Sequence, residues 1–158
     1  MDRTLIDRYE AGAATLREAV QDLTAEQFDA RPDPGAGAGT WTIRELVWHL
    51  VDSDLVSATR MKLIIAHDTP RINAYDENRF VARLGYQRMD VPSALALFEA
   101  NRRAVAQMLR GLPDTAFDRS GVHEESGPIT LAKMVELYIW HVEHHLAFAR
   151  RKLALVGV

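Results

Sequence analysis

Apolar side chains recur at steps of three and four residues in four separate stretches of the chain, the spacing that places them on one face of an α-helix. The first stretch predicts a helix that ends near Asp22. The second predicts a helix that ends near Ala66, because the proline of the following segment HDTP disfavours helical geometry in the residue before it. Two further long helices are predicted after Asp90 and after Thr130. The stripe residues are Ile6, Tyr9, Ala13, Leu16, Val20 and Leu23 in the first helix, Ile43, Leu46, Val47, Leu50, Met61 and Ile64 in the second, Leu95, Phe98, Val105 and Leu109 in the third, and Met134, Tyr138, His141, His145 and Phe148 in the fourth.

Capping residues indicate where these helices begin and end. Thr42 and Glu45 have the spacing of a capping box, and Trp41 with Leu46 has the spacing of a hydrophobic staple, so the second long helix has a well-defined start. The further signals are Thr24 with Gln27 before a short helical turn, Asp76 before a short helix in YDENRF, Asp90 with Pro92, Gly111 at the end of the third long helix, and Thr130. Glycines and prolines predict a loop over residues 31–40.

These elements predict an all-α fold, most simply a four-helix bundle, with residues 1–158 forming one domain. No segment shows the sustained alternation of apolar and polar residues that is typical of a strand. The connections that flank the second long helix, about 20 residues each, are longer than an up-and-down bundle requires. They leave room for crossover connections.

Composition narrows the function classes. The net charge is −3 and the basic residues are scattered, which argues against nucleic-acid binding. The densest basic run, residues 150–152, is expected to complement a helix end. The N-terminal segment MDRTLIDRYE lacks the pattern of a signal peptide, and no apolar run approaches the roughly 20 residues of a membrane span. We therefore expect a soluble cytoplasmic protein with no membrane partner.

Three of the six histidines lie within the segment WHVEHHL. Because the chain has no cysteine, any metal ion must be held by nitrogen and oxygen ligands. On a helix His141 and His145 are separated by about 40° and one turn, whereas His144 lies about 60° to the other side of His141, so geometry favours the 141/145 pair only mildly. A catalytic metal site takes three protein ligands. His49, beside the apolar stripe of the second long helix, is the candidate for the third.

Other polar residues have candidate roles of their own. His123, in the segment SGVHEESG, is expected to lie in a loop near the mouth of the bundle, where it could serve substrate binding or proton transfer. Asp52 is expected to be a surface acid of the second long helix, although it follows His49 by three residues and could be a partner for that ring. His67 lies at a predicted helix end, where cations are favoured. We also expect surface positions for Asp54 and Glu143, core or staple positions for Trp41, Trp48, Tyr138 and Trp140, and a loop-anchoring position for Tyr75.

Taken together, the stretches WTIRELVWHLVDSDL, RMKLIIAHDTPRINAYDENRF and GPITLAKMVELYIWHVEHHLAFA resemble the DinB/YfiT-like family of metal-dependent proteins, and its YfiT branch in particular. The resemblance covers nearly the whole chain. One histidine followed far downstream by His-x-x-x-His is fairly specific when it occurs with this tryptophan-led helix start. The chain departs from the family pattern at Trp48, where the family often has a second histidine, and at residues 123–125, where it often has His-Pro-Glu.

The resemblance implies a DinB-type four-helix bundle with nonsequential connectivity, often as a homodimer. It also implies a divalent metal ion, zinc or nickel, held by the residues at positions His49, His141 and His145. This resolves the choice between His144 and His145 in favour of His145.

Such a site is compatible with two enzymatic reactions. A metal-activated thiolate that attacks an electrophile would make the protein a low-molecular-weight thiol S-transferase, as relatives in this family are, whereas an activated water would make it a metal-dependent hydrolase. The sequence favours the transferase because it shows no carboxylate placed as the general base of a hydrolase. A third alternative is a non-enzymatic, stress-linked metal-binding protein that docks a partner.

Overall fold

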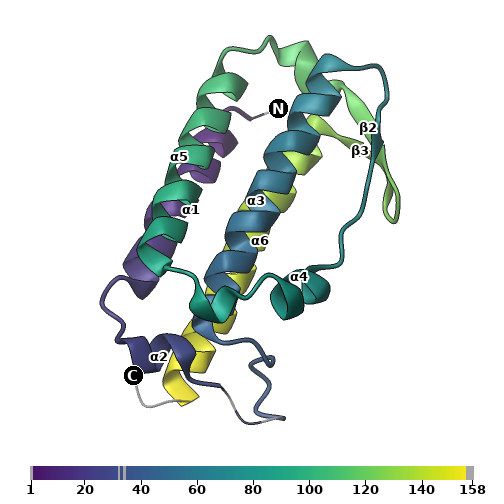
Figure 1. Ribbon diagram of the computed structural model, residues 1–158. Helices are drawn as coiled ribbons and strands as arrows, with labels where there is room; N and C mark the ends of the chain where they lie inside the picture. Colours follow the sequence, from purple (N-terminus) through teal and green to yellow (C-terminus); the bar gives the residue numbers. More distant parts are fainter. Residues whose placement is uncertain (1, 32, 34, 156–158) are drawn as a thin grey trace.

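The computed structural model describes residues 2–31, 33 and 35–155. Four long helices dominate it, and two short α-helices, two short 3₁₀ helices and three short strands connect them (Figure 1). In chain order the elements are α1 (Thr4–Val20), α2 (Ala25–Asp29), α3 (Ile43–Ala66), β1 (Arg71–Ile72), α4 (Glu77–Arg83), η1 (Tyr86–Arg88), α5 (Val91–Arg110), η2 (Asp114–Asp118), β2 (Ser120–His123), β3 (Gly127–Thr130) and α6 (Leu131–Leu155).

The four long helices form a bundle in which neighbours in the chain are not always neighbours in space. Helices α1 and α6 run downward in the view of Figure 1, and α3 and α5 run upward. Helix α1 packs on α5 and α6, and α3 packs on the same two helices. The first two long helices therefore occupy opposite corners of the bundle. The prediction of a four-helix bundle with nonsequential connectivity is confirmed.

The parallel arrangement of α3 and α5 requires a connection that returns along the length of the bundle. Residues 67–90 make this return and contain β1, α4 and η1 (Figure 1). Asp76 caps α4 by accepting a hydrogen bond from the backbone N–H of Arg79 at 3.1 Å. The crossover connection places the first turn of α4 beside α3, where this turn contributes to the candidate site.

The predicted helix ends agree closely with the structure. Thr24 and Thr42 each form a complete capping box, with Gln27 and Glu45 respectively. Asp90 caps α5, Pro92 lies in its first turn, and Gly111 is its C-cap residue. The Thr130 hydroxyl accepts from the backbone N–H of Lys133 at 3.1 Å and so caps α6. These local signals depend on a few adjacent residues, which is why the sequence alone reveals them.

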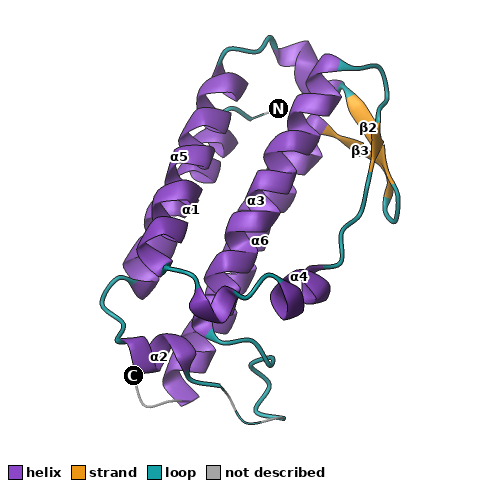
Figure 2. Ribbon diagram, viewed as in Figure 1, coloured by secondary structure: helices purple, strands orange, loops and turns teal. Residues whose placement is uncertain are grey.

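A small three-stranded sheet is the element that the sequence prediction missed (Figure 2). Strand β1 pairs in parallel with β2, and β2 pairs antiparallel with β3, so the order is β1-β2-β3. The strands have only two to four residues each, too few for an alternating pattern to emerge. The hairpin of β2 and β3 places His123 at the end of a strand, which corrects the expectation that this histidine lies in a loop.

The buried apolar side chains form two clusters, one in each half of the bundle. We call them the lower and the upper cluster after their positions in Figure 1. A polar layer separates them: it includes Ser53, Asp54 and Ser57 on α3 and Arg102 on α5, all buried. The lower cluster includes Leu16, Leu46, Leu50, Phe98 and Leu146, and the upper cluster includes Ile6, Met61, Val105, Phe117 and Leu131.

None of the helices in the described part of the chain is both long enough and apolar enough to cross a membrane.

Candidate metal centre

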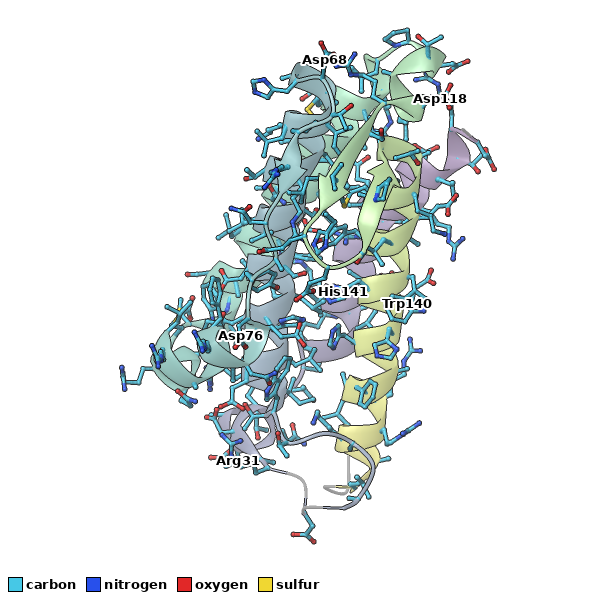
Figure 3. The ribbon with its side chains drawn as sticks, turned by 90° about the vertical axis from the view of Figure 1, so that its right-hand side faces the viewer. Arg31, Asp68, Asp76, Asp118, Trp140 and His141 are labelled. Atoms are coloured by element: carbon cyan, nitrogen blue, oxygen red, sulfur yellow. The ribbon has the colours of Figure 1, made fainter. Side chains whose placement is uncertain are left out.

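The three predicted ligands come together between α3 and α6. His49 lies in the second turn of α3, and His141 and His145 lie one turn apart on α6, which runs antiparallel beside it. Figure 3 shows His141 between these two helices below the β2–β3 hairpin, whereas the adjacent Trp140 lies at the outer side of α6. Residues nearly a hundred positions apart in the sequence therefore meet at one point.

The Nε2 atoms of the three rings form a compact triangle. His49 lies 3.3 Å from His141 and 3.2 Å from His145, and the two histidines of α6 are 3.1 Å apart. A tetrahedral ion bound by imidazole nitrogens at about 2.0–2.1 Å would have ligand nitrogens about 3.3 Å apart. The donor set and its spacing therefore fit a divalent ion such as zinc, with one position left open.

Burial keeps all three imidazoles in the neutral form that a metal ligand needs. Desolvation, followed by the charge of neighbouring histidines, lowers the pKa of His49 to about 3 and that of His141 to about 2. Desolvation also lowers the pKa of His145 to about 4, with further contributions from His144 and Lys152. A triangle of neutral rings has three short contacts between nitrogens, and a cation at its centre would satisfy all three lone pairs at once.

Aromatic rings surround the histidines and fix their orientation. Trp41 packs on His49 with ring centroids 4.8 Å apart and stacks nearly parallel to His145 at 6.4 Å. Tyr138 meets His141 edge-on at 5.8 Å. Because Trp41 directly precedes the capping residue Thr42, the well-defined start of α3 also holds this ring against the site.

Glu77 is the functional candidate that sequence reasoning missed. It is the first residue of α4, and its Oε2 atom lies 3.8 Å from Nε2 of His49. Burial, together with the neighbouring Asp76, raises the pKa of this carboxyl group. The sequence shows no carboxylate placed as a general base, whereas the structure brings the Glu77 carboxylate beside the candidate metal centre. Nothing local in the sequence signals the contact, because the crossover connection alone brings α4 to α3.

Two acids on α3 also differ from expectation. Asp52 does not bond to the ring of His49; its carboxylate accepts the hydroxyl of Tyr86. Asp54 is not a surface acid, since its side chain is only 2% exposed and forms an ion pair with Arg102 at 3.0 Å. Both corrections arise because α3 contacts α5 and η1 as well as α6, so most of its circumference is covered.

The remaining residues singled out from the sequence lie outside the triangle. His144 stacks on Trp140 at 4.6 Å, and Trp140 is 53% exposed, which corrects its expected core position. Glu143 forms an exposed ion pair with Arg8, in agreement with a surface position. His67 is the exposed C-cap residue of α3.

The remaining aromatic residues either lie in or beside the apolar core or anchor a loop. Trp48 is buried in the lower cluster, where Trp41 packs at its edge, and Tyr138 is buried in the upper cluster. Tyr75 packs on Phe80 at 4.9 Å and so anchors the loop before α4.

The basic run near the C-terminus does not have the expected role. The Lys152 ammonium group is buried and donates to the carbonyls of Ala38 and Gly39, and Arg151 donates to the carbonyl of Gly37 at 2.8 Å. These side chains therefore fasten the loop before α3 to the last turns of α6, instead of complementing the helix end itself.

Two pockets flank the histidines along the groove between α3 and α6. The first, about 240 Å³, includes His145 and is lined mainly by apolar side chains; we call it the His145 pocket. The second, about 180 Å³, includes His141 and is lined mainly by residues with polar side chains; we call it the His141 pocket. Their principal lining residues are Trp41, Leu46, Asn78, Phe148 and Lys152 in the first, and Ser53, Arg60, Tyr75, Glu77, His123 and Tyr138 in the second.

Comparison with known proteins places this site in a family context. The family model described as the DinB superfamily matches residues 8–149. A relative from Oceanobacillus iheyensis is 36% identical over 132 residues, which cover 84% of this chain and 74% of the relative. YfiT of Bacillus subtilis is 35% identical over 135 residues, which cover 85% of this chain and 74% of YfiT. Both relatives are named "Putative metal-dependent hydrolase".

Two solved structures have the same architecture. The structure of Bacillus subtilis YfiT, described as a probable metal-dependent hydrolase with an unusual four-helix bundle topology, matches with a TM-score of 0.89 at 32% identity and covers 98% of this chain and 86% of its own. The mycothiol-dependent maleylpyruvate isomerase matches with a TM-score of 0.70 at 12% identity and covers 91% of this chain and 58% of its own. At that identity the second match establishes a shared fold only.

Proposed function

The chain belongs to the DinB superfamily, and on that premise we propose that it is a metal-dependent hydrolase whose ion, zinc or nickel, is held by His49, His141 and His145. One observation carries this proposal. Three neutral imidazole nitrogens lie 3.1–3.3 Å apart, and a carboxylate oxygen of Glu77 lies 3.8 Å from one of them. The names of the 36% and 35% identical relatives agree with this class of enzyme.

In this proposal the three histidines bind the metal ion and Glu77 transfers protons. A divalent ion in such a site supplies Lewis acidity, which polarises a carbonyl group and lowers the pKa of water. Glu77 is the general base: its carboxylate takes a proton from the attacking water and returns it to the leaving group. Trp41 covers the histidines from the side of the His145 pocket, and this limits the access of bulk solvent.

The test is hydrolysis of an activated amide or ester by zinc-loaded protein without added thiol. Wild-type protein should turn over the substrate, and a chelator should abolish turnover. The Glu77→Gln variant should keep its metal content and lose about 10²- to 10⁴-fold in kcat, the usual contribution of a general base. Glu143 is exposed, pairs with Arg8 and lines neither pocket beside the histidines, so Glu143→Gln is the matched control. Chelator-insensitive turnover, or full activity of Glu77→Gln, would refute the proposal.

A thiol S-transferase is the second candidate, and the His145 pocket favours it. About 240 Å³ of largely apolar space adjoins His145, enough for part of a low-molecular-weight thiol or its electrophile. Three neutral ligands also leave the charge of the ion uncompensated, a setting that lowers the pKa of a thiol. Metal-dependent consumption of an electrophilic probe with one member of a panel of cellular thiols, but not without it, would favour this candidate. Metal-loaded protein that is inert in both assays would point to a non-enzymatic metal-binding protein.

A further inference from the structure

The His141 pocket contains a buried cation without a negatively charged partner. Arg60 is only 9% exposed. Its Nη1 atom donates to the hydroxyl of Tyr138 at 3.0 Å, and its Nη2 atom donates to the backbone carbonyl of Asn73 at 2.6 Å. Both acceptors are neutral, and the buried Nε–H has no acceptor among the residues that the structure describes. A guanidinium group has five N–H donors, so most of the binding capacity of Arg60 is uncommitted.

A second buried arginine, Arg102, has the negatively charged partner that Arg60 lacks. Arg102 forms an ion pair with the carboxylate of Asp54 at 3.0 Å and also donates to the backbone carbonyls of Tyr9 and Tyr138. Arg60 forms no ion pair with any carboxylate of the described residues. Taking a charge out of water is costly unless an opposite charge compensates it. Among the described residues no ion pair supplies this compensation for Arg60, whose guanidinium carbon lies 5.9 Å from the Tyr75 ring; an anionic ligand would supply the opposite charge.

The neighbours of Arg60 in the pocket also offer hydrogen-bond donors. The Tyr138 hydroxyl, which accepts from Arg60 at 3.0 Å, also has an O–H group that can act as a donor. Nδ1 of His123 accepts from the backbone N–H groups of Glu125 and Ser126 at 3.3 Å each, so a neutral His123 ring has its hydrogen on Nε2. Arg60, Tyr138 and His123 line the same space of about 180 Å³. A pocket with this set of donors suits an anionic oxygen ligand.

Two acids at the rim restrict the charge of that ligand. Glu77 and Glu125 line the same pocket, and both are exposed. Two carboxylates around one guanidinium group disfavour a doubly charged phosphate more strongly than a singly charged carboxylate. A carboxylate also matches the planar fork of an arginine, with two parallel hydrogen bonds.

We propose that the His141 pocket binds a carboxylate group of the substrate through Arg60. This inference rests on the proposed function, because it places the scissile amide or ester at the histidines and the carboxylate on the side of His141. The opposite end of the substrate then lies in the His145 pocket, whose walls include Trp41 and Phe148. The substrate class is accordingly an acyl compound with a free carboxylate on one side of the scissile bond and an apolar or aromatic group on the other.

The first experiment measures binding without relying on turnover. Succinate, its neutral analogue succinamide, and inorganic phosphate are titrated by calorimetry into wild-type protein with and without zinc. Succinate should bind in both forms, and both succinamide and phosphate should bind at least tenfold more weakly. The Arg60→Gln variant should lose tenfold or more in succinate affinity, the usual loss when a charged hydrogen-bonding group is removed.

Arg119→Gln is the matched control, because Arg119 also holds backbone carbonyls at the upper end of α3 but does not line the His141 pocket. Its succinate affinity should stay within twofold of wild type, and circular dichroism should show that both variants are folded. Four results would overturn the proposal: no succinate binding to folded wild type, equal binding by Arg60→Gln, preference for phosphate, or binding only when zinc is present. If Arg60→Gln does not fold, Arg60→Lys, which keeps the charge but loses the fork, should show the same tenfold loss, and wild-type affinity in that variant would count against the proposal.

The second experiment compares turnover of two amides that differ only at the distal carboxylate, N-succinyl-4-nitroanilide and N-butyryl-4-nitroanilide. Zinc-loaded wild type should prefer the succinyl amide in kcat/KM by tenfold or more, mainly through KM, and Arg60→Gln should abolish this preference. Equal preference in wild type and variant would overturn the carboxylate site. If neither amide is hydrolysed although succinate binding depends on Arg60, the hydrolase proposal fails while the carboxylate site stands.

Discussion

Two polar clusters in the described interior of the bundle, one around Arg102 and one formed by the three histidines, differ in how far their groups satisfy one another. Around Arg102, the guanidinium group bonds to the Asp54 carboxylate and to two backbone carbonyls, and the rings of Tyr9 and Phe98 cover it at 4.3 and 4.7 Å. We call this the closed cluster. In the histidine triangle, three neutral nitrogens point at one another, and the carboxylate of Glu77 lies 3.8 Å from Nε2 of His49.

This difference distinguishes a cluster that stabilises the fold from a cluster that is suited to bind a ligand. A closed cluster has no free donor or acceptor for a ligand, so its contribution is to fix the packing of α1, α3, α5 and α6. In the histidine triangle a cation would satisfy three converging nitrogen lone pairs, so its geometry fits the proposed metal site. Gly12 marks the closed cluster from the side of α1: a Cβ atom there would lie 2.5 Å from Nη1 of Arg102, so α1 can approach this closely only with glycine at that position.

The largest predicted effect comes from breaking the closed cluster. Replacing Arg102 with leucine leaves the Asp54 carboxylate buried and without a counter-charge, which should lower the free energy of unfolding by about 3–5 kcal/mol. Urea denaturation of the metal-free protein measures this change. Arg103→Leu, next in sequence but on the exposed side of α5, should change the same quantity by less than about 0.5 kcal/mol. A loss below about 1 kcal/mol in Arg102→Leu would show that the pair does not hold the bundle together.

The second prediction concerns stabilisation of the histidine triangle by zinc. Zinc at a hundredfold excess over its dissociation constant should raise the free energy of unfolding of wild type by about 2.7 kcal/mol. His49→Ala should abolish this gain, because only two ligands remain. His67→Ala removes an exposed histidine outside the triangle and should keep the full gain. Equal stabilisation of wild type and His49→Ala in thermal unfolding would contradict the predicted site.

The third prediction uses the lowered pKa values of the triangle. An unfolded histidine titrates near 6.5, whereas burial lowers the pKa of His49 to about 3, so between these values the unfolded state binds more protons. Stability of the metal-free protein should therefore fall as the pH drops below 6.5. From pH 7 to pH 5.5 each such histidine should contribute about 1 kcal/mol of loss. The loss should be smaller by about this amount in His49→Gln, as measured by urea denaturation at both pH values, and an identical pH slope in the two proteins would argue against the assignment.

The smallest effect is expected at the surface, where neither kind of cluster exists. The Arg8–Glu143 ion pair has side chains that are 60% and 53% exposed. Replacing Glu143 with glutamine should change the free energy of unfolding by no more than about 0.5 kcal/mol, because solvent screens such pairs. A change in the free energy of unfolding above about 1 kcal/mol in urea denaturation would contradict the distinction between the buried clusters and the exposed surface.

Local patterns account for what the sequence predicts well. The four long helices follow from apolar periodicity, and their starts follow from Thr42, Asp90 and Thr130, whose capping partners lie three residues away. The triangle could also be anticipated, since two of its members lie one turn apart on one helix and His49 lies near an apolar stripe. The resemblance to a known family selected His145 over His144.

The contacts that sequence reasoning missed all depend on distant segments. Asp54 lies among residues that face α5, and its partner Arg102 is 48 positions away. Glu77 reaches His49 only because the crossover connection returns along the bundle. The parallel pairing of β1 with β2 joins residues 71–72 to residues 122–123 and has no local signature. The preference for a transferase depended on the absence of a carboxylate, so the position of Glu77 removes its main support.

The most direct test of the histidine triangle as a metal site is the metal content of untagged protein. It is measured by plasma mass spectrometry for wild type, His49→Ala and His145→Ala. About one zinc or nickel ion per chain is expected in wild type, with loss in both variants and unchanged helicity by circular dichroism. Folded wild-type protein that takes up no ion after incubation with zinc or nickel would contradict the account. The three histidines would then be core residues and not metal ligands.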